Sequence, residues 1–184
     1  MRQTQHRAQA WILTLIIIVA ASCFGAVKTL NRMADDVQAV FIGVDNETQT
    51  PPSIAQDLRV KAGYAWNMAT IAKKHLEPLQ YAPLENAITV LENSNTPRAA
   101  FEASDMVSRQ AEEVQRLLEN LADMMKDTDY TAMQKCIVNM RSLDDVIARS
   151  GYNDTAAQFN EALDRFPANV FAGIFSIKGA ELYE

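Results

Sequence analysis

The sequence is poor in residues that break helices or build cross-linked and metal-bound folds. Its 184 residues include six glycines, six prolines, two cysteines and two histidines. So few glycines and prolines leave little of the turn chemistry that an all-β fold needs. Cys23 lies in an apolar stretch and Cys136 in a helical pattern, which gives neither a disulfide framework nor metal-ligand spacing. These scarcities favour an all-α fold.

Positive charge is also scarce. The formal net charge is −6, and residues 1–27 carry Arg2 and Arg7 without any acid, so the rest of the chain is more negative still. An acidic domain repels phosphate backbones, and no cluster of Lys and Arg with interleaved aromatics offsets that repulsion. We therefore predict that nucleic acid is not a partner.

The residues that catalysis requires are nearly absent. His75 is the single histidine after residue 27, and no Glu-x-x-His pair accompanies it, as the di-iron bundles require. The glycines never cluster into a phosphate-cradling loop. A serine or cysteine nucleophile needs a base that a third group holds, and His75 is the sole ordinary candidate. We predict no catalytic, cofactor or metal residues, and interpret the chain as not an enzyme.

One long uncharged run is present near the start. Between Arg7 and Lys28 lie 20 residues without a charge, which as a helix would span about 30 Å, the thickness of a bilayer core. We divide the chain into a short tail (1–7), a transmembrane signal anchor in contact with the lipid bilayer (8–27) and a helical bundle (28–184). This predicts a single-pass membrane protein.

Three interpretations of that run stay open. Besides an uncleaved anchor, Arg2 and Arg7 followed by the small residues 20–22 also suit a cleaved secretory signal. The sequence Ala-Ala-Ser-Cys at residues 20–23 further resembles a bacterial lipobox with lipid attachment at Cys23. Lys28 and Arg32 nearly balance the leading arginines, so charge hardly decides the orientation. We place the soluble domain outside the cytoplasm, with a cytoplasmic domain as the alternative.

Turn and cap signals divide the remaining residues into helices. The prolines at 51–52 end a first helix, and Ser53 begins the next in a capping-box pattern with Gln56. The apolar face of this helix is rich in alanine and steps by three or four residues: Leu58, Ala62, Ala65, Ala69, Ala72 and Leu76. Small residues allow close helix approach, so we expect an inner helix that ends near Pro78, and a shorter helix after Pro83.

Two further helices follow. Thr96 and Pro97 suit the N-cap and first position of the first of these helices. Its apolar seam again alternates steps of four and three: Val107, Ala111, Val114, Leu118, Leu121 and Met125. A last long helix runs from Met133 to Phe166, with a distortion expected at Gly151. We predict an antiparallel bundle of about four helices with coiled-coil-like seams, behind the N-terminal transmembrane helix.

The segment 166–178 is more apolar than a disordered terminus tolerates. We expect Val170, Phe171, Ile174 and Phe175 to fold back and close one end of the bundle. The alternative is a contact surface for a membrane or a partner.

The end of the chain resembles the LemA family of membrane-anchored bacterial proteins. The residues that carry the likeness follow the family's order: Tyr152-Asn153, Phe166-Pro167, Asn169, Ala172, Phe175 and Tyr183-Glu184. A second match lies at Leu58 to Met68, where Asn67 agrees, whereas Gly63 and Trp66 stand where the family usually has Asp and Pro. The resemblance implies a helical bundle behind a membrane helix, and family-motif or interaction roles for the matching residues. It also implies a cytoplasmic domain.

Three functions are compatible with these observations. The first is a non-enzymatic, membrane-tethered interaction or scaffolding module in the bacterial envelope. Its protein partner is unknown, and a second copy of the chain is one candidate. The second is a regulator of a membrane enzyme such as an envelope protease. The third is a ligand-binding bundle, with His75 and a neighbouring carboxylate as its candidate residues.

Overall fold

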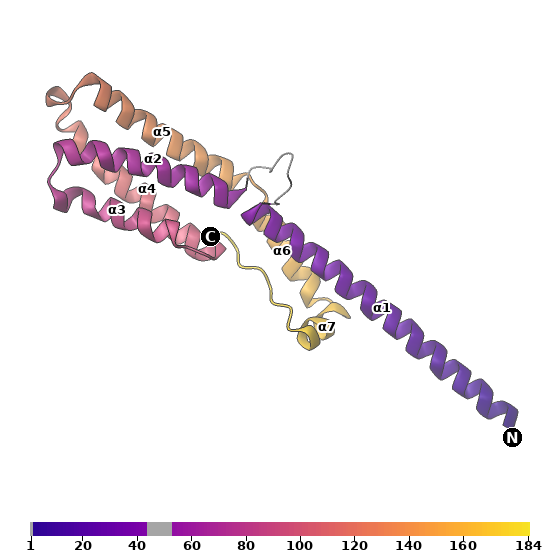
Figure 1. Ribbon diagram of the computed structural model, residues 1–184. Helices are drawn as coiled ribbons and strands as arrows, with labels where there is room; N and C mark the ends of the chain where they lie inside the picture. Colours follow the sequence, from indigo (N-terminus) through magenta and orange to yellow (C-terminus); the bar gives the residue numbers. More distant parts are fainter. Residues whose placement is uncertain (1, 44–52) are drawn as a thin grey trace. The chain divides into compact units, whose positions relative to one another are not determined.

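The computed structural model describes residues 2–43 and 53–184, with only the backbone described at 2–10, 12, 15–16 and 19–20. Every regular element in this part of the chain is a helix, which confirms the all-α prediction. The elements are α1 (Arg2–Ile42), α2 (Ile54–His75), α3 (Pro78–Glu92), α4 (Pro97–Glu119), the short 3-10 helix η1 (Ala122–Met124), α5 (Asp127–Ala148), α6 (Tyr152–Asp164) and α7 (Ala168–Phe175). Figure 1 labels the α-helices along the chain.

These elements belong to two compact units. One unit combines residues 38–153 with residues 181–184, and its body is the bundle of α2, α3, α4 and α5 (Figure 1). Helix α2 contacts α3, α4 and α5, and α4 also contacts α3 and α5. Short connections make successive helices run in opposite directions. The predicted antiparallel bundle of about four helices is therefore present in this unit.

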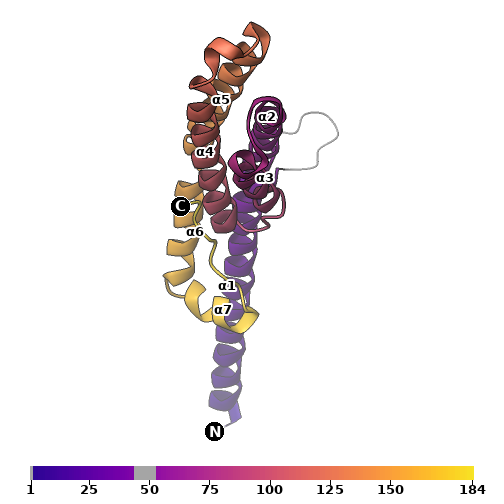
Figure 2. The ribbon, with the colours of Figure 1, turned by 90° about the vertical axis from the view of Figure 1, so that its left-hand side faces the viewer.

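The other unit combines α1 up to Val37 with residues 154–180. Its buried apolar side chains come from α1 and α6: Leu30, Val37, Ala156, Phe159 and Leu163. Figure 2 shows α1 in indigo, and α6 and α7 in yellow tones.

The predicted anchor, residues 8–27, lies in α1, and several of its side chains fall outside the described part of the structure. Within the described residues, no helix has the length and apolar character needed to cross a bilayer.

The cap signals place two helix starts correctly. The Ser53 hydroxyl accepts a hydrogen bond from the Gln56 amide at 3.3 Å, and the Thr96 hydroxyl accepts one from the Ala99 amide at the same distance. Each bond satisfies an amide that the first turn of a helix leaves without a partner. Pro97 occupies the first turn of α4, where its missing N–H costs nothing.

The start of α3 was predicted wrongly. The helix begins at Pro78, five residues before the expected start, and Pro83 lies inside it. The Gln80 side chain accepts a hydrogen bond from the Glu77 amide at 2.9 Å, which completes the cap. Pro83 has no N–H to donate to the Leu79 carbonyl, but Leu79 is 89% exposed, so water can take that place.

The predicted last helix is two helices. Helix α5 ends at Ala148 and α6 begins at Tyr152, because Gly151 has a φ of 73°. A left-handed residue cannot continue a right-handed helix, and glycine adopts this conformation without steric cost. The expected distortion at Gly151 is thus a complete break.

The apolar seams form the core as predicted, except at Leu76 and Leu121, which are only half-buried. The alanine-rich face of α2 is buried at Leu58, Ala62, Ala65, Ala69 and Ala72, and the α4 seam at Val107, Ala111, Val114 and Leu118. The remaining two seam positions, Leu121 and Met125, lie beyond the end of α4 at Glu119. Met125 is nevertheless buried.

The expectation that α7 buries its apolar side chains is wrong. No residue of α7 is buried, and Val170, Ile174 and Phe175 are respectively 48%, 67% and 58% exposed. Phe166, which precedes this helix, is 83% exposed.

Candidate functional site

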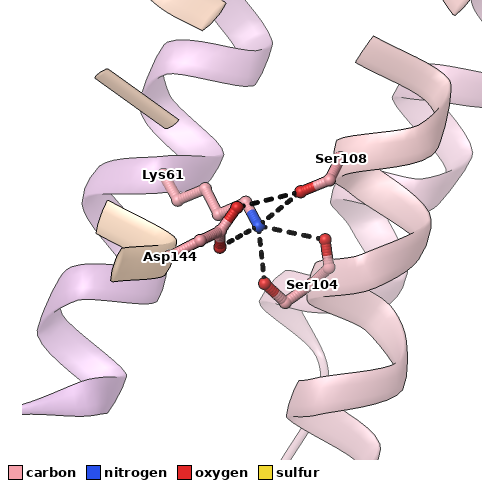
Figure 3. A network of polar contacts seen from close by, with 4 residues as sticks. All are labelled: Lys61, Ser104, Ser108 and Asp144. Atoms are coloured by element: carbon pink, nitrogen blue, oxygen red, sulfur yellow. Dashed lines mark hydrogen bonds and ion pairs between the residues drawn. The ribbon is translucent and has the colours of Figure 1, made fainter. Parts of the chain in front are cut away.

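A lysine lies in the core of the bundle. The side chain of Lys61, from α2, is 1% exposed. Its ammonium group lies 2.5 Å from Asp144 Oδ1 and donates to the hydroxyls of Ser104 and Ser108, each at 2.7 Å (Figure 3). It also lies 3.1 Å from the Ser104 carbonyl. The Ser108 hydroxyl in turn donates to Asp144 Oδ2 at 3.2 Å. We call Lys61, Ser104, Ser108 and Asp144 the lysine cluster.

The lysine cluster compensates for a costly burial. Burial lowers the pKa of Lys61 because it disfavours the charged ammonium, whereas the hydrogen bond and negative charge of Asp144 act in the opposite direction. A buried charge needs a counter-ion and hydrogen-bond partners for all its donors, and here both are present. The cluster thus joins α2, α4 and α5 through one polar contact point.

Sequence reasoning missed the lysine cluster. The one available signal was position: Lys61 follows Leu58 by three residues and precedes Ala65 by four, so it lies on the apolar stripe of α2. Which carboxylate would face it depends on the packing of α5, because Asp144 is 83 residues away.

A serine beside a lysine amine can act as an activated nucleophile, but the observed geometry does not suit that chemistry. Ser104 is 3% exposed and its hydroxyl accepts a hydrogen bond from a lysine that is itself bound by a carboxylate. A nucleophile must reach its substrate, and these buried groups do not.

A short extended segment docks against the same bundle. In this tail segment, Glu181–Glu184, both main-chain groups of Tyr183 bind the side-chain amide of Asn153. Asn153 Nδ2 donates to the Tyr183 carbonyl at 3.0 Å, and Oδ1 accepts from the Tyr183 amide at 2.8 Å. The Tyr152 hydroxyl donates to the Glu181 carbonyl at 2.7 Å. Two adjacent residues of α6 therefore hold the tail segment by its backbone.

The half-buried Tyr183 side chain packs against two residues of α4. Its ring meets the ring of Phe101 edge to face, with centroids 5.2 Å apart and an interplanar angle of 80°. The pKa of Tyr183 is raised to about 12, chiefly by burial; a hydrogen bond from the Ser104 side chain lowers it, and the negative charge of Asp144 raises it. The neutral phenol thus contacts Ser104, which belongs to the lysine cluster. We call Phe101, Ser104, Tyr152 and Asn153 the cradle.

The raised pKa predicts how stability depends on alkaline pH. A folded-state pKa near 12, against 10 for an ordinary tyrosine, stabilises the fold below pH 10, and this contribution is lost as the pH rises through 12. Its size is on the order of 2 kcal/mol. The ultraviolet absorbance of tyrosinate should show one of the five tyrosines ionising near pH 12. Tyr183→Phe should remove that component, and an unchanged alkaline titration would contradict the assignment.

The residues that carry the resemblance occupy several places. Tyr152, 3% exposed, and Asn153 belong to the cradle. Asn67 is exposed on α2 and is not among the residues that contact the tail segment. Phe166, Pro167 and Phe175 are exposed. The structure therefore assigns a clear contact role to Tyr152 and Asn153 alone among these six.

Two more of these residues, Asn169 and Ala172, line a hollow of about 410 Å³ in the unit that contains α6 and α7. Asn160 also lines it, and its side-chain amide brackets Ala180: Nδ2 donates to the Ala180 carbonyl at 2.9 Å, and Oδ1 accepts from the Ala180 amide at 2.7 Å. Asn160 thus binds the main chain of Ala180 in the same way as Asn153 binds the main chain of Tyr183. It was not among the predicted residues.

His75 takes part in an ion-paired contact between α2 and α5. Its Nε2 lies 3.1 Å from Asp129 Oδ2, and Lys74 Nζ lies 3.0 Å from Asp129 Oδ1. The hydrogen bond from Lys74, and then that from His75, lowers the pKa of Asp129. No nucleophile appears among these contacts.

Cys136 is a buried thiol of α5. Burial raises the pKa of the Cys136 thiol, which disfavours the reactive thiolate. Across residues 2–43 and 53–184, no group of three or more His, Cys, Asp and Glu side chains is arranged to hold a metal ion.

Comparison with known proteins places these features in a family. No functionally curated protein matches the chain. The LemA family matches residues 66–184, which include α3 to α7, the tail segment and the two asparagines that bracket backbone groups. That match covers more than half of the sequence. The chain therefore belongs to the LemA family.

Proposed function

We propose that the protein is a membrane-anchored, non-enzymatic interaction module of the bacterial envelope. The observation that carries this proposal is the exposure of large apolar side chains around α7. Phe166 is 83% exposed, Ile174 67% and Phe175 58%. Soluble proteins keep exposed apolar patches small, and larger ones mark contacts with other molecules. The occupant we favour is a protein, including a second copy of the chain.

The buried polar side chains already have hydrogen-bond partners within the protein, which supports a role without catalysis. Lys61 contacts the side chains of Asp144, Ser104 and Ser108, and no buried side-chain nitrogen or oxygen in the described structure lacks a hydrogen-bond partner. Active sites usually retain polar groups that are free to bind substrate. The lysine cluster instead fixes the packing of three helices.

The uncharged run at 8–27 supports the membrane anchor. Lipid offers no hydrogen-bond partners, and a helix satisfies its own backbone, so 20 uncharged residues suit a span. Deleting residues 8–27 should move the protein from the membrane fraction to the soluble fraction after ultracentrifugation. If the deleted and full chains sediment alike, the anchor is wrong.

The orientation has its own test. We propose that residues 28–184 lie outside the cytoplasm. External protease should then degrade this region once the outer layer of the cell is permeabilised. Complete protection, with degradation only after membrane lysis, would instead assign the bundle to the cytoplasm.

A photo-crosslinking experiment tests the interaction role. A crosslinking residue at Phe171 in the membrane-embedded chain should yield specific higher-mass products. Ile174→Ser with Phe175→Ser should remove them, because polar side chains weaken apolar contact. Val138→Ser is the matched control: Val138 is a 61% exposed apolar residue of α5. Absence of any product above background, self-crosslinks included, would end the proposal.

A further inference from the structure

The contacts of the tail segment have the chemistry of peptide recognition. Asn153 binds the amide and carbonyl of Tyr183, and Tyr152 binds the carbonyl of Glu181. All three hydrogen bonds are made to main-chain atoms of the tail segment, and every extended segment presents such atoms. Selectivity then comes from one side chain, the Tyr183 ring, which meets Phe101 and reaches Ser104. This division, with backbone bonds for affinity and one pocket for specificity, is how proteins read extended peptides.

The tail segment can leave without unfolding a helix. Helix α7 ends at Phe175, and residues 177–184 have no regular secondary structure. Glu181 and Glu184 are exposed, and Leu182 and Tyr183 are half-buried. Tyr183 also binds Asn153 and meets Phe101, so it is the main anchor of the segment. Its departure would give up three hydrogen bonds to its main chain and the contacts of one half-buried ring, while the bundle helices stay intact.

We propose that the cradle of Phe101, Ser104, Tyr152 and Asn153 is a peptide-binding site for an extended segment that bears a tyrosine, and that residues 181–184 are its built-in, displaceable ligand. The same segment of a second copy of the chain is the partner that fits it. This site lies in the bundle and does not depend on the apolar residues around α7.

Occupancy of the cradle by the tail segment also controls the access of solvent to the lysine cluster. The Tyr183 phenol is hydrogen-bonded with Ser104, whose own hydroxyl accepts from Lys61 at 2.7 Å. With the phenol in place, Lys61 and Ser104 are 1% and 3% exposed. When the segment leaves, water reaches Ser104 and then the Lys61 amine, so Lys61 becomes a reporter of the empty cradle.

The binding test uses a shortened chain, residues 1–180, in detergent. This chain keeps the hydrogen bonds between Asn160 and Ala180. Fluorescence anisotropy measures binding of a labelled peptide, Glu-Leu-Tyr-Glu, and of the same peptide with alanine in place of tyrosine. The tyrosine peptide should bind at least about tenfold more tightly, since burying an aromatic ring is worth more than 1.4 kcal/mol. The full chain should bind it at least about tenfold more weakly than the shortened chain, because the tethered segment competes at a millimolar effective concentration.

Matched variants of the shortened chain locate the site. Asn153→Asp should abolish binding, because a carboxylate cannot donate to the tyrosine carbonyl. Asn67→Asp makes the same chemical change at an exposed position of α2 and should leave binding unchanged. Acylation of Lys61, measured by mass spectrometry, should rise at least about tenfold on shortening and fall again with the tyrosine peptide.

Three outcomes would overturn the inference: equal binding of the two peptides, equal affinity of the full and shortened chains, or equal effects of the Asn153 and Asn67 variants. If circular dichroism shows that the shortened chain is unfolded, the full-length Tyr183→Ala variant decides instead. It keeps the rest of the segment, and it should bind the tyrosine peptide more tightly than the unaltered chain does. Failure to do so would also overturn the inference.

Discussion

Replacing Asp144 by alanine is expected to lower the free energy of unfolding by about 3 kcal/mol at neutral pH. The Asp144 side chain is partly exposed, but its removal leaves the Lys61 ammonium without a counter-ion, and the Lys61 side chain is only 1% exposed. Removing one partner of a buried pair costs far more than the pair contributes, because the remaining ion stays desolvated. Chemical denaturation followed by circular dichroism measures this loss.

A double-mutant cycle separates this loss from simple packing defects. Lys61→Met should cost only about 1 kcal/mol, because an apolar side chain of similar length fills the space and Asp144 remains hydrated. In the double variant the effect of Asp144→Ala should nearly disappear, which gives a coupling of about 2 kcal/mol. Additive losses would mean that the two side chains do not interact as an ion pair.

The loss in Asp144→Ala should depend on pH. Burial lowers the folded-state pKa of Lys61 below its ordinary value of 10.5, and removing Asp144 takes away a contact that raises it. Between the folded and unfolded pKa values the unfolded chain binds more protons, so stability rises with pH in that window. The deficit of Asp144→Ala should be largest at pH 6 and shrink as the pH approaches 10.5. A deficit that does not change with pH would indicate a cause other than the buried charge.

Tyr152→Ala is expected to lower the free energy of unfolding by about 4 kcal/mol, the typical cost of deleting a buried aromatic ring. Tyr152 is 3% exposed, its ring lies 5.6 Å from that of Phe41, and its hydroxyl holds the Glu181 carbonyl. The same denaturation measurement applies.

Two controls separate the ring from the hydroxyl of Tyr152. Tyr152→Phe keeps the ring and loses one hydrogen bond, so it should cost about 1 kcal/mol. Phe166→Ala removes a ring that is 83% exposed and should change stability by less than about 0.5 kcal/mol. Equal losses for the alanine and phenylalanine variants of Tyr152 would show that the hydroxyl, rather than the ring, stabilises the bundle.

The starts of α2 and α4 could be read from the sequence, because caps are local. Ser53 and Thr96 each satisfy an amide three residues away, and neither depends on the rest of the fold. Where the local signals conflicted, prediction failed. Pro83 suggested a late start for α3, but Pro78 and Gln80 complete an earlier one.

The apolar seams were equally predictable, since a helical repeat of apolar residues has to be buried somewhere. Leu58, Ala65 and Ala72 lie in the core as expected. The same reasoning failed for α7, where Ile174 and Phe175 remain exposed. A pattern of residues shows that a surface is apolar, but only the packed fold decides whether the chain itself covers that surface.

In the candidate site, too, local features could be predicted from the sequence, whereas contacts between separate helices could not. The sequence by itself determined an all-helical chain, the caps of α2 and α4, most of its core and the family-like Tyr152-Asn153 pair. Tertiary structure alone brought Lys61 to Asp144, 83 residues away, and placed Tyr183 on Asn153, 30 residues away. Caps and periodicity act over a few residues of one helix, whereas a charge pair or a docked segment exists only after separate helices have packed.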